Sequence, residues 1–422
     1  LGGINPFVAS GRDTTLLRQI ADRTAQRLTK ELKDQPDVEA ELRNVLGEVY
    51  RLTGDFAKGE AMHRQALALR RNFSAHENAD VAESLENLAS NLRMGGKPAE
   101  AEPMQREAIE MRKRLLGAEH AVVAWSIRNL AQILGPQGKL AEVEALHREA
   151  LAMRRKLLGE QHTDVADSLE SMSWVLAKEG KLAEAETSAR EALTIYRKET
   201  GAESGNVALS LSALAFVLEK QHRLAEAEST AREALAMDRK IFGSDHPWYL
   251  QTLDILSQVL QGEGKLAEAE ATQREALTLR RKILAKDHPS VANSLVSLAL
   301  VLCAQGKPVE AETFAQECLD FREQRTPDDW QTFNTRSVLG GSLLGQKRYA
   351  EAEPLLLSGY DGMKQRAASI PTDGKVRLKE ALQRLAQLYE ATGQAEKAAE
   401  WNRKLAEFDQ AEAGKNTAVP KP

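Results

Sequence analysis

The chain has 422 residues, 42% of them hydrophobic and 28% charged, a balance typical of a folded globular or repeat protein that excludes a disordered chain. Lys and Arg number 57 against 62 Asp and Glu, and both signs are interspersed, which excludes the clustered positive charge of a nucleic-acid interface. Aromatic residues make up only 5%, and Ala and Leu carry much of the hydrophobic content, so we expect helices and no β-rich fold.

Residues 1–36 are predicted to form an N-terminal entry segment with a capping helix. The chain begins at Leu1 without Met and without a basic-then-apolar signal pattern, from which we expect an excised region or a processed product. No apolar run reaches the roughly 18 residues needed to cross a bilayer, so we expect no membrane insertion by this region. We expect a cytoplasmic location; the alternative is tethering to a membrane through an upstream segment.

One pattern recurs every 42 residues between residues 37 and 371. His120 and His162 stand 42 residues apart, as do His246 and His288, and Ser204 occupies the position between the two pairs. Each unit contains an apolar run of helical period, a Gly-Lys turn, a second such run that usually opens with AEAE or a close variant, and a short polar loop. A fixed period of this length is the sequence signature of a repeat architecture.

The two runs of each unit predict a pair of helices, which we call helix A and helix B. In the unit that starts at Asn78, helix A carries an apolar stripe formed by Val81, Leu85, Leu88 and Leu92. A glycine then ends helix A in a left-handed conformation. The glycine positions are Gly54, Gly96, Gly138, Gly180, Gly264 and Gly306, with His222 as a replacement and Lys347 at that place in a unit shortened by one residue.

Helix B has alanine where it must approach helix A closely, for example at Ala101 and Ala108. It also carries Glu-to-Arg pairs four residues apart, such as Glu102 with Arg106, which we expect to form surface ion pairs. One helix pair cannot cover its own apolar face, so neighbouring pairs must stack. We therefore predict an all-α, right-handed superhelical solenoid of antiparallel helix pairs, ending in a degenerate capping pair at residues 372–410 and a disordered tail at residues 411–422.

The repeat unit LxNLAxxLxxxGKxAEAExxxREALAxRRKLLGxxH resembles the 42-residue tetratricopeptide repeat of the kinesin light chain type, over about residues 37 to 410. The stretch GRDTTLLRQIADRTAQRLTKELKDQPDVEAELRNVLGEVY is similar to the entry segment of tetratricopeptide regions in bacterial multidomain proteins, several of which carry an upstream serine/threonine kinase domain.

This resemblance implies a non-catalytic scaffold that binds a peptide or protein segment on the concave helix A surface. The alternative is the sensor or regulatory arm of a larger signalling enzyme, a serine/threonine kinase or caspase-like protease, whose catalytic domain is not in this chain. A third hypothesis is a structural scaffold that self-associates.

The chain has no GxSxG, HExxH or Walker motif, so we expect no enzymatic activity and no cofactor. Cys303 and Cys318 lack zinc spacing, and the repeated histidines are separated by a whole repeat, so we expect no metal site. We expect the histidines to shape the loop before helix A.

Exposed helix A positions in adjacent repeats supply the candidate partner-binding residues, because large aromatic anchors dominate interfaces and this chain has few of them. These residues are Trp125, Arg128, Glu170, Trp174, Leu209 and Phe216. The alternative is that the rings pack against the neighbouring helix A as core. Kinesin light chain repeats use helix A asparagines to hold the backbone of an extended peptide, and the resemblance therefore adds Asn87 and Asn129. The later repeats have other residues at this position.

Overall fold

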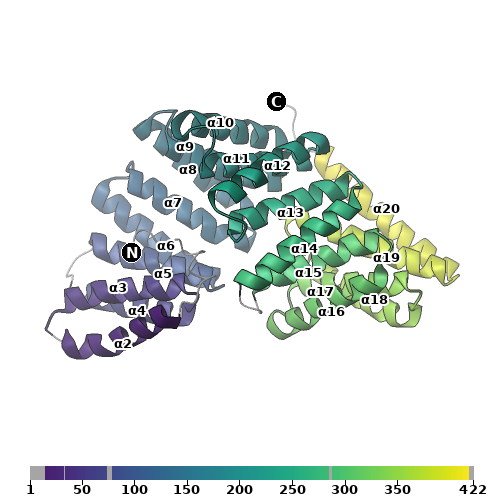
Figure 1. Cartoon of the computed structure of the whole chain (residues 1–422), viewed down its shortest axis with the longest axis horizontal. Coiled ribbons are helices and arrows are strands. Elements are labelled where there is room, and N and C mark those ends of the chain that lie inside the picture. Colours follow the sequence, from purple (N-terminus) through teal and green to yellow (C-terminus); the bar gives the residue numbers. More distant parts are fainter. Residues whose placement is uncertain (1–14, 33, 74–77, 285–287, 418–422) are drawn as a thin grey trace. The chain divides into compact units, whose positions relative to one another are not determined.

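The computed structural model describes residues 15–32, 34–73, 78–284 and 288–417, and helices are the only regular elements within those ranges (Figure 1). The chain divides into two compact units, Leu1–Ile255 and Leu256–Pro422, and the boundary falls inside α13. The all-α class predicted from the sequence is therefore confirmed, and each unit is described by itself below.

Unit 1 contains eleven complete α-helices in its described part, a 3-10 turn and the first part of α13. These are α2 (Thr15–Glu31), α3 (Pro36–Leu52), α4 (Phe56–Phe73), α5 (Ala79–Met94), α6 (Pro98–Leu116), α7 (Ala121–Leu134), η1 (Gly135–Gln137), α8 (Leu140–Leu158), α9 (Thr163–Lys178), α10 (Leu182–Thr200), α11 (Gly205–Lys220), α12 (Leu224–Ile241) and α13 (Pro247–Gly262).

Unit 2 contains the end of α13 and the helices that follow it. These are α14 (Leu266–Ile283), α15 (Pro289–Ala304), α16 (Pro308–Arg325), α17 (Trp330–Gly345), α18 (Tyr349–Gln365), the 3-10 turns η2 (Ala367–Ser369) and η3 (Thr372–Gly374), α19 (Val376–Ala391) and α20 (Ala395–Thr417).

Within each unit the helices pack as the predicted pairs. In unit 1, α3 packs on α4, α5 on α6, α7 on α8, α9 on α10 and α11 on α12 (Figure 1). The B helices α4, α6, α8 and α10 also contact the helix A of the next pair. Unit 2 repeats this arrangement from α15 to α20. The alanines predicted at the pair interface, Ala101 and Ala108 among them, are fully buried. Neighbouring pairs therefore bury their apolar faces against one another, and the buried residues form successive clusters that each combine side chains from adjacent helix pairs.

Histidine side chains begin several of the A helices. The Nδ1 atom of His120 accepts a hydrogen bond from the backbone N–H of Val122 at 3.2 Å, and that of His162 accepts one from Asp164 at 3.1 Å. His246 and His288 make the same contact to the second residue after them. The repeated histidine is thus a helix N-cap that satisfies an otherwise unpaired N–H group, which confirms its predicted place before helix A.

Ion pairs connect helix B of one repeat to the next repeat. Glu102 accepts hydrogen bonds from Arg106 on its own helix and from Lys139 of the following Gly-Lys turn, with N–O distances of 2.9 and 2.7 Å. Equivalent pairs recur at Glu144, Glu186 and Glu270. The hydrogen bond from Lys307 lowers the pKa of Glu270 by more than partial burial raises it. Together with the hydrogen bond from Arg274, it brings this pKa to about 2.

Helices α2, α19 and α20 lie at the two ends of the described part of the chain. Helix α2 falls in the predicted entry segment, of which residues 1–14 lie outside the described part of the chain. Helices α19 and α20 form the last pair, and α20 continues to Thr417, into the segment predicted as a disordered tail. Residues 418–422 are outside the described residues. The division of the chain into these segments remains a prediction.

The turn after helix A requires a left-handed backbone. Gly180 has φ 82°, and no atom lies within 4 Å of the place where a Cβ would stand. One repeat later His222 adopts φ 58° at the same position, and Lys347 adopts φ 62° in the shortened unit. The turn geometry is therefore kept even where a side chain makes it costly, by about 1–2 kcal/mol for a non-glycine residue.

We expect Gly180→Ala to lower the free energy of unfolding by about 1 kcal/mol, because the left-handed conformation is unfavourable for a residue with a Cβ. The matched change one repeat later, His222→Gly, is expected to leave stability unchanged or to raise it. Urea denaturation followed by circular dichroism measures both. Equal destabilisation by the two changes would contradict the assignment of this strain to the backbone.

Candidate functional site

A column of buried polar side chains runs through the repeats on helix B. Arg70, Arg154, Arg280 and Arg322 occupy it and are each less than a tenth exposed, and Arg112 occupies it in the second repeat. Each of the first four donates to a Ser or Thr hydroxyl on the next helix A, as Arg154 does to Ser168 at 2.8 Å. The column therefore ties helix B to its neighbour through hydrogen bonds of a buried charge, which are among the stronger ones in proteins.

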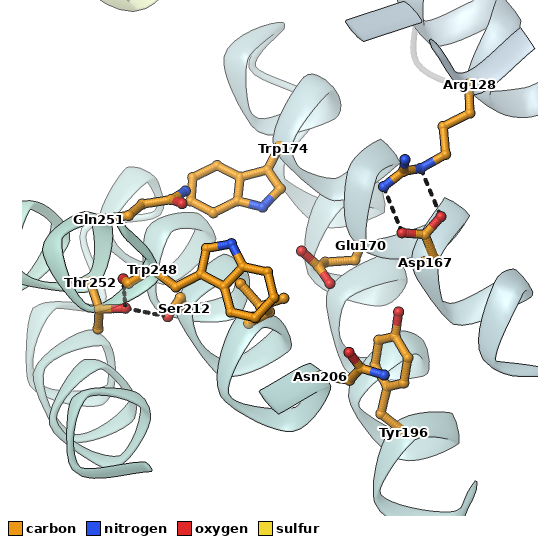
Figure 2. A pocket seen from close by; sticks show the side chains of 11 residues that line it. Arg128, Asp167, Glu170, Trp174, Tyr196, Asn206, Ser212, Trp248, Gln251 and Thr252 are labelled. Carbon is orange, nitrogen blue, oxygen red and sulfur yellow. Dashed lines mark hydrogen bonds and ion pairs between the residues drawn. The ribbon is translucent and has the colours of Figure 1, made fainter. Parts of the chain in front are cut away.

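In two successive repeats the column has no arginine, because Tyr196 and Asp238 stand at its position. A cavity of about 330 Å³ lies beside this interruption, and we call it the unit 1 cavity (Figure 2). Its lining comes from α7, α9, α10, α11 and α13. The lining residues are Arg128, Asp167, Glu170, Trp174, Tyr196, Asn206, Leu209, Ser212, Trp248, Gln251 and Thr252.

One end of the cavity is closed by a charged cluster. Arg128 donates a hydrogen bond from Nη2 to Oδ1 of Asp167 at 2.8 Å and makes an ion-pair contact from Nε to Oδ2 at 2.7 Å (Figure 2). Arg154 also contacts the carboxylate of Asp167, with its Nη1 atom at 2.8 Å from Oδ2. Asp167 therefore engages both guanidinium groups, and the two-point pair fixes the orientation of Arg128.

Aromatic rings form another wall of the cavity. Trp174 stacks on Phe216 with 4.6 Å between ring centroids. Trp248, at the start of α13, packs edge-on against Phe242 and against the N-capping ring of His246, both at 4.8 Å. These contacts hold the two indoles in place, so the cavity has rigid aromatic sides.

Glu170 is the one carboxylate of the lining without a partner in the described part of the chain, since no hydrogen bond or ion pair reaches its oxygens. Figure 2 shows its carboxylate pointing toward the indole of Trp248. Burial disfavours the charged form of Glu170 and raises its pKa, and the negative charge of Asp167 raises it further. The positive charge of Arg128 lowers this pKa, but the net result is a pKa of about 8. The hydroxyl of Ser210 on α11 is also buried without a hydrogen-bond partner.

The structure brings half of the sequence-predicted residues together. Arg128, Glu170, Trp174 and Leu209 line the cavity, and Phe216 is buried beneath Trp174, as the alternative of a core ring expected for it.

The other three predicted residues lie elsewhere on the helix A surface. Trp125 on α7 is 46% exposed and does not line the cavity. Asn87 on α5 and Asn129 on α7 are half-buried and also lie outside the lining.

Several lining residues were not among the residues predicted from the sequence, Tyr196, Asn206 and Trp248 among them. Tyr196 lies on helix B, and Asn206 and Trp248 lie at the first turns of α11 and α13. The signal for Tyr196 is visible in the sequence, because Tyr196 and Asp238 interrupt an arginine that stands at this position in five other repeats. Trp248 gives a weaker signal as one of only five tryptophans.

Within the described ranges, no group of three or more His, Cys, Asp and Glu side chains could hold a metal ion. A search of the same residues finds no helix that is long and apolar enough to span a membrane. The unit 1 cavity, with its aromatic walls and its unpaired carboxylate, is the candidate functional site.

The family model for the tetratricopeptide repeat matches residues 38–114, 80–156, 122–198, 206–282, 255–324 and 290–365, which together make up most of the chain. Four of the five later matches begin a multiple of 42 residues after the start of the first. No curated protein matches the chain in sequence.

Solved structures match the chain at low sequence identity, and the first two named here show the same fold. A Rap protein complexed with Competence and Sporulation Factor is 15% identical with a TM-score of 0.60, over 89% of this chain and 99% of that one. The apo quorum sensor NprR from B. thuringiensis is 14% identical with a TM-score of 0.58, over 88% and 99%. BtubC (BKLC) from P. vanneervenii is 22% identical with a TM-score of 0.47, over 54% and 92%.

The raised pKa of Glu170 makes its effect on stability depend on pH. A glutamate in the unfolded chain titrates near 4.5, so the folded chain binds this proton more tightly. The stability that the group contributes is therefore full below about pH 4.5 and is lost as the pH rises through 8. We expect wild type to lose free energy of unfolding relative to Glu170→Gln across this range, by a few kcal/mol.

Urea denaturation of both proteins at several pH values between about 5 and 9 measures the difference. Glu110→Gln, a change at an exposed glutamate of α6, is the matched control. A difference between wild type and Glu170→Gln that stays constant with pH would contradict the assignment.

Proposed function

The chain belongs to the tetratricopeptide-repeat family, and we propose that it is a non-catalytic interaction scaffold that holds a peptide or protein segment against the helix A surface of unit 1. The observation that carries this proposal is the unit 1 cavity, which lies between successive A helices and combines aromatic walls with polar groups. Concave sites of mixed apolar and polar lining are the usual places for ligand recognition.

The lining positions support the proposal because they repeat in register. Arg128, Glu170 and Ser212 stand at the same position of three successive A helices, and Asp167, Leu209 and Gln251 stand at another. A segment that runs across the A helices would meet equivalent positions in turn, as expected of an elongated ligand on a repeat surface. The likeness in fold to the Rap protein, solved with Competence and Sporulation Factor, is consistent with such use of the fold.

The proposed segment would use the two indoles of the cavity as its main contacts. Trp174 and Trp248 are held by neighbouring rings and are partly open to the cavity. Rigid aromatic side chains contribute much of the binding energy at interfaces because they lose little conformational freedom. If the chain is instead the regulatory arm of a larger signalling enzyme, the same cavity is the proposed input site.

A random peptide library displayed on phage and selected on the full chain tests the proposal. We expect enriched peptides to bind the wild type, and we expect Trp174→Ala and Trp248→Ala each to weaken binding by at least tenfold, since loss of a buried aromatic anchor costs more than about 1.4 kcal/mol. Isothermal titration calorimetry with the synthesised peptides gives the dissociation constants.

Trp125→Ala is the matched control, because Trp125 lies on a neighbouring helix A but does not line the cavity. It should leave binding within about twofold of wild type. Circular dichroism establishes that each variant is folded. Enriched peptides that bind the folded Trp174→Ala and Trp248→Ala variants as well as wild type would overturn the assignment of the cavity.

A further inference from the structure

The second repeat contains a complete version of the polar arrangement that is broken beside the cavity. Arg112 of the helix B column places Nη2 at 3.3 Å from Oε2 of Glu86 on α5. Ser126 on α7 donates from its hydroxyl to the other oxygen of the same carboxylate. The carboxylate is only 6% exposed, so its charge is balanced by a cation inside the repeat stack.

Two repeats later, the same three positions hold Glu170, Tyr196 and Ser210. The acid and the serine are kept, while the cation is replaced by a phenol. The Glu170 carboxylate receives no hydrogen bond or ion pair from the described residues, and the Ser210 hydroxyl is buried without a partner. This repeat therefore keeps the acceptor of a cation and lacks the cation itself.

The nearby arginines do not fill this role. Arg128 and Arg154 both bind Asp167, Arg128 through two contacts and Arg154 through one. The oxygens of Glu170 instead face the cavity, whose other walls are the rings of Trp174, Trp248 and Tyr196 (Figure 2). Aromatic faces attract cations, and guanidinium groups stack well on them.

We propose that the unit 1 cavity accepts a basic side chain of the bound segment, an arginine above all, whose guanidinium takes the place that a column arginine would occupy opposite Glu170. The inference rests on the proposed function, because it identifies one residue type in the segment that the scaffold holds. The guanidinium donates to the Glu170 carboxylate and lies against the indoles, and its charge is balanced without any change in the rest of the column.

The cavity volume suits one side chain and its stem. At about 330 Å³ it lies at the lower end of the range for small-molecule sites. A lysine would satisfy the carboxylate as a point charge. An arginine can donate to the carboxylate and stack its planar guanidinium on an aromatic ring at the same time. We therefore expect arginine to bind more tightly than lysine.

The test uses blocked pentapeptides, Gly-Gly-Arg-Gly-Gly and the same peptide with citrulline in place of arginine. Citrulline keeps the shape and lacks the charge. The full chain is labelled with fluorotryptophan, and the five tryptophan signals are assigned by Trp-to-Phe variants. We expect the arginine peptide to shift the signals of Trp174 and Trp248 in fluorine NMR and to leave that of Trp125 in place.

Two variants separate the charge from the cavity. Glu170→Gln keeps the shape and removes the negative charge, and we expect it to weaken the arginine peptide at least tenfold and bring it level with the citrulline peptide. Tyr196→Arg restores the column cation opposite Glu170, and we expect it to abolish binding of the arginine peptide by occupying the site. Circular dichroism and the unshifted Trp125 signal show that both variants are folded.

The pH dependence of binding gives a further readout. The cation requires ionised Glu170, so the arginine peptide should bind more tightly as the pH rises from about 6 to 9 in wild type and show no such rise in Glu170→Gln. The groups that face Glu170 are Arg128 from α7, Asp167 from its own helix, Tyr196 from α10, Asn206 and Ser212 from α11, and Trp248 and Gln251 from α13. Burial and the charges of Glu170 and Asp167 raise the pKa of Tyr196, which stays neutral over this range.

Equal binding of the arginine and citrulline peptides, or an arginine peptide that shifts neither Trp174 nor Trp248, would overturn this inference. The proposed function would still stand if library peptides lost affinity in the Trp174→Ala and Trp248→Ala variants. If library peptides were insensitive to those changes while the arginine peptide bound as expected, the proposed function would fail and the cation site alone would remain.

Discussion

Every feature of the two units depends on the inability of a single helix pair to bury its own apolar face. Each pair packs on the next, and the alanines at Ala101, Ala108 and their equivalents allow the helices to approach closely enough to do so. Polar groups must then be accommodated inside the stack. The arginine column on helix B does this by donating to the following helix A, so the same contact that satisfies a buried charge also connects neighbouring repeats.

The candidate site follows from a local departure from this rule. Where the column changes to Tyr196 and Asp238, the apolar packing of the alanines continues undisturbed, and Ala185, Ala192, Ala227 and Ala234 are fully buried. The stack therefore holds its geometry while one of its polar contacts is missing. A carboxylate left in place by such a change keeps its desolvation cost and has no charge to offset it, which is the condition that raises the pKa of Glu170.

The sequence predicts most of the fold because period, helix pairs, left-handed turns and histidine positions all recur in register. The site is predicted less well, for physical reasons that differ between residues. Trp174 and Phe216 have the same helix A position, yet stacking buries Phe216 and leaves Trp174 at the cavity, a choice decided by side-chain packing and not by spacing. Tyr196 was not predicted because the candidate residues were taken from helix A positions. The cavity lies where the repeated arginine of helix B is replaced.

The lining of the cavity comes from four successive A helices, α7, α9, α11 and α13, together with α10. Its shape therefore exists only while the junctions between these repeats are closed. In a stack held by nearest-neighbour contacts, fraying at any junction between these repeats would open the cavity and release an occupant. An occupant would in turn make fraying less frequent. The backbone amide hydrogens of these helices would then exchange more slowly, including those that do not touch the occupant.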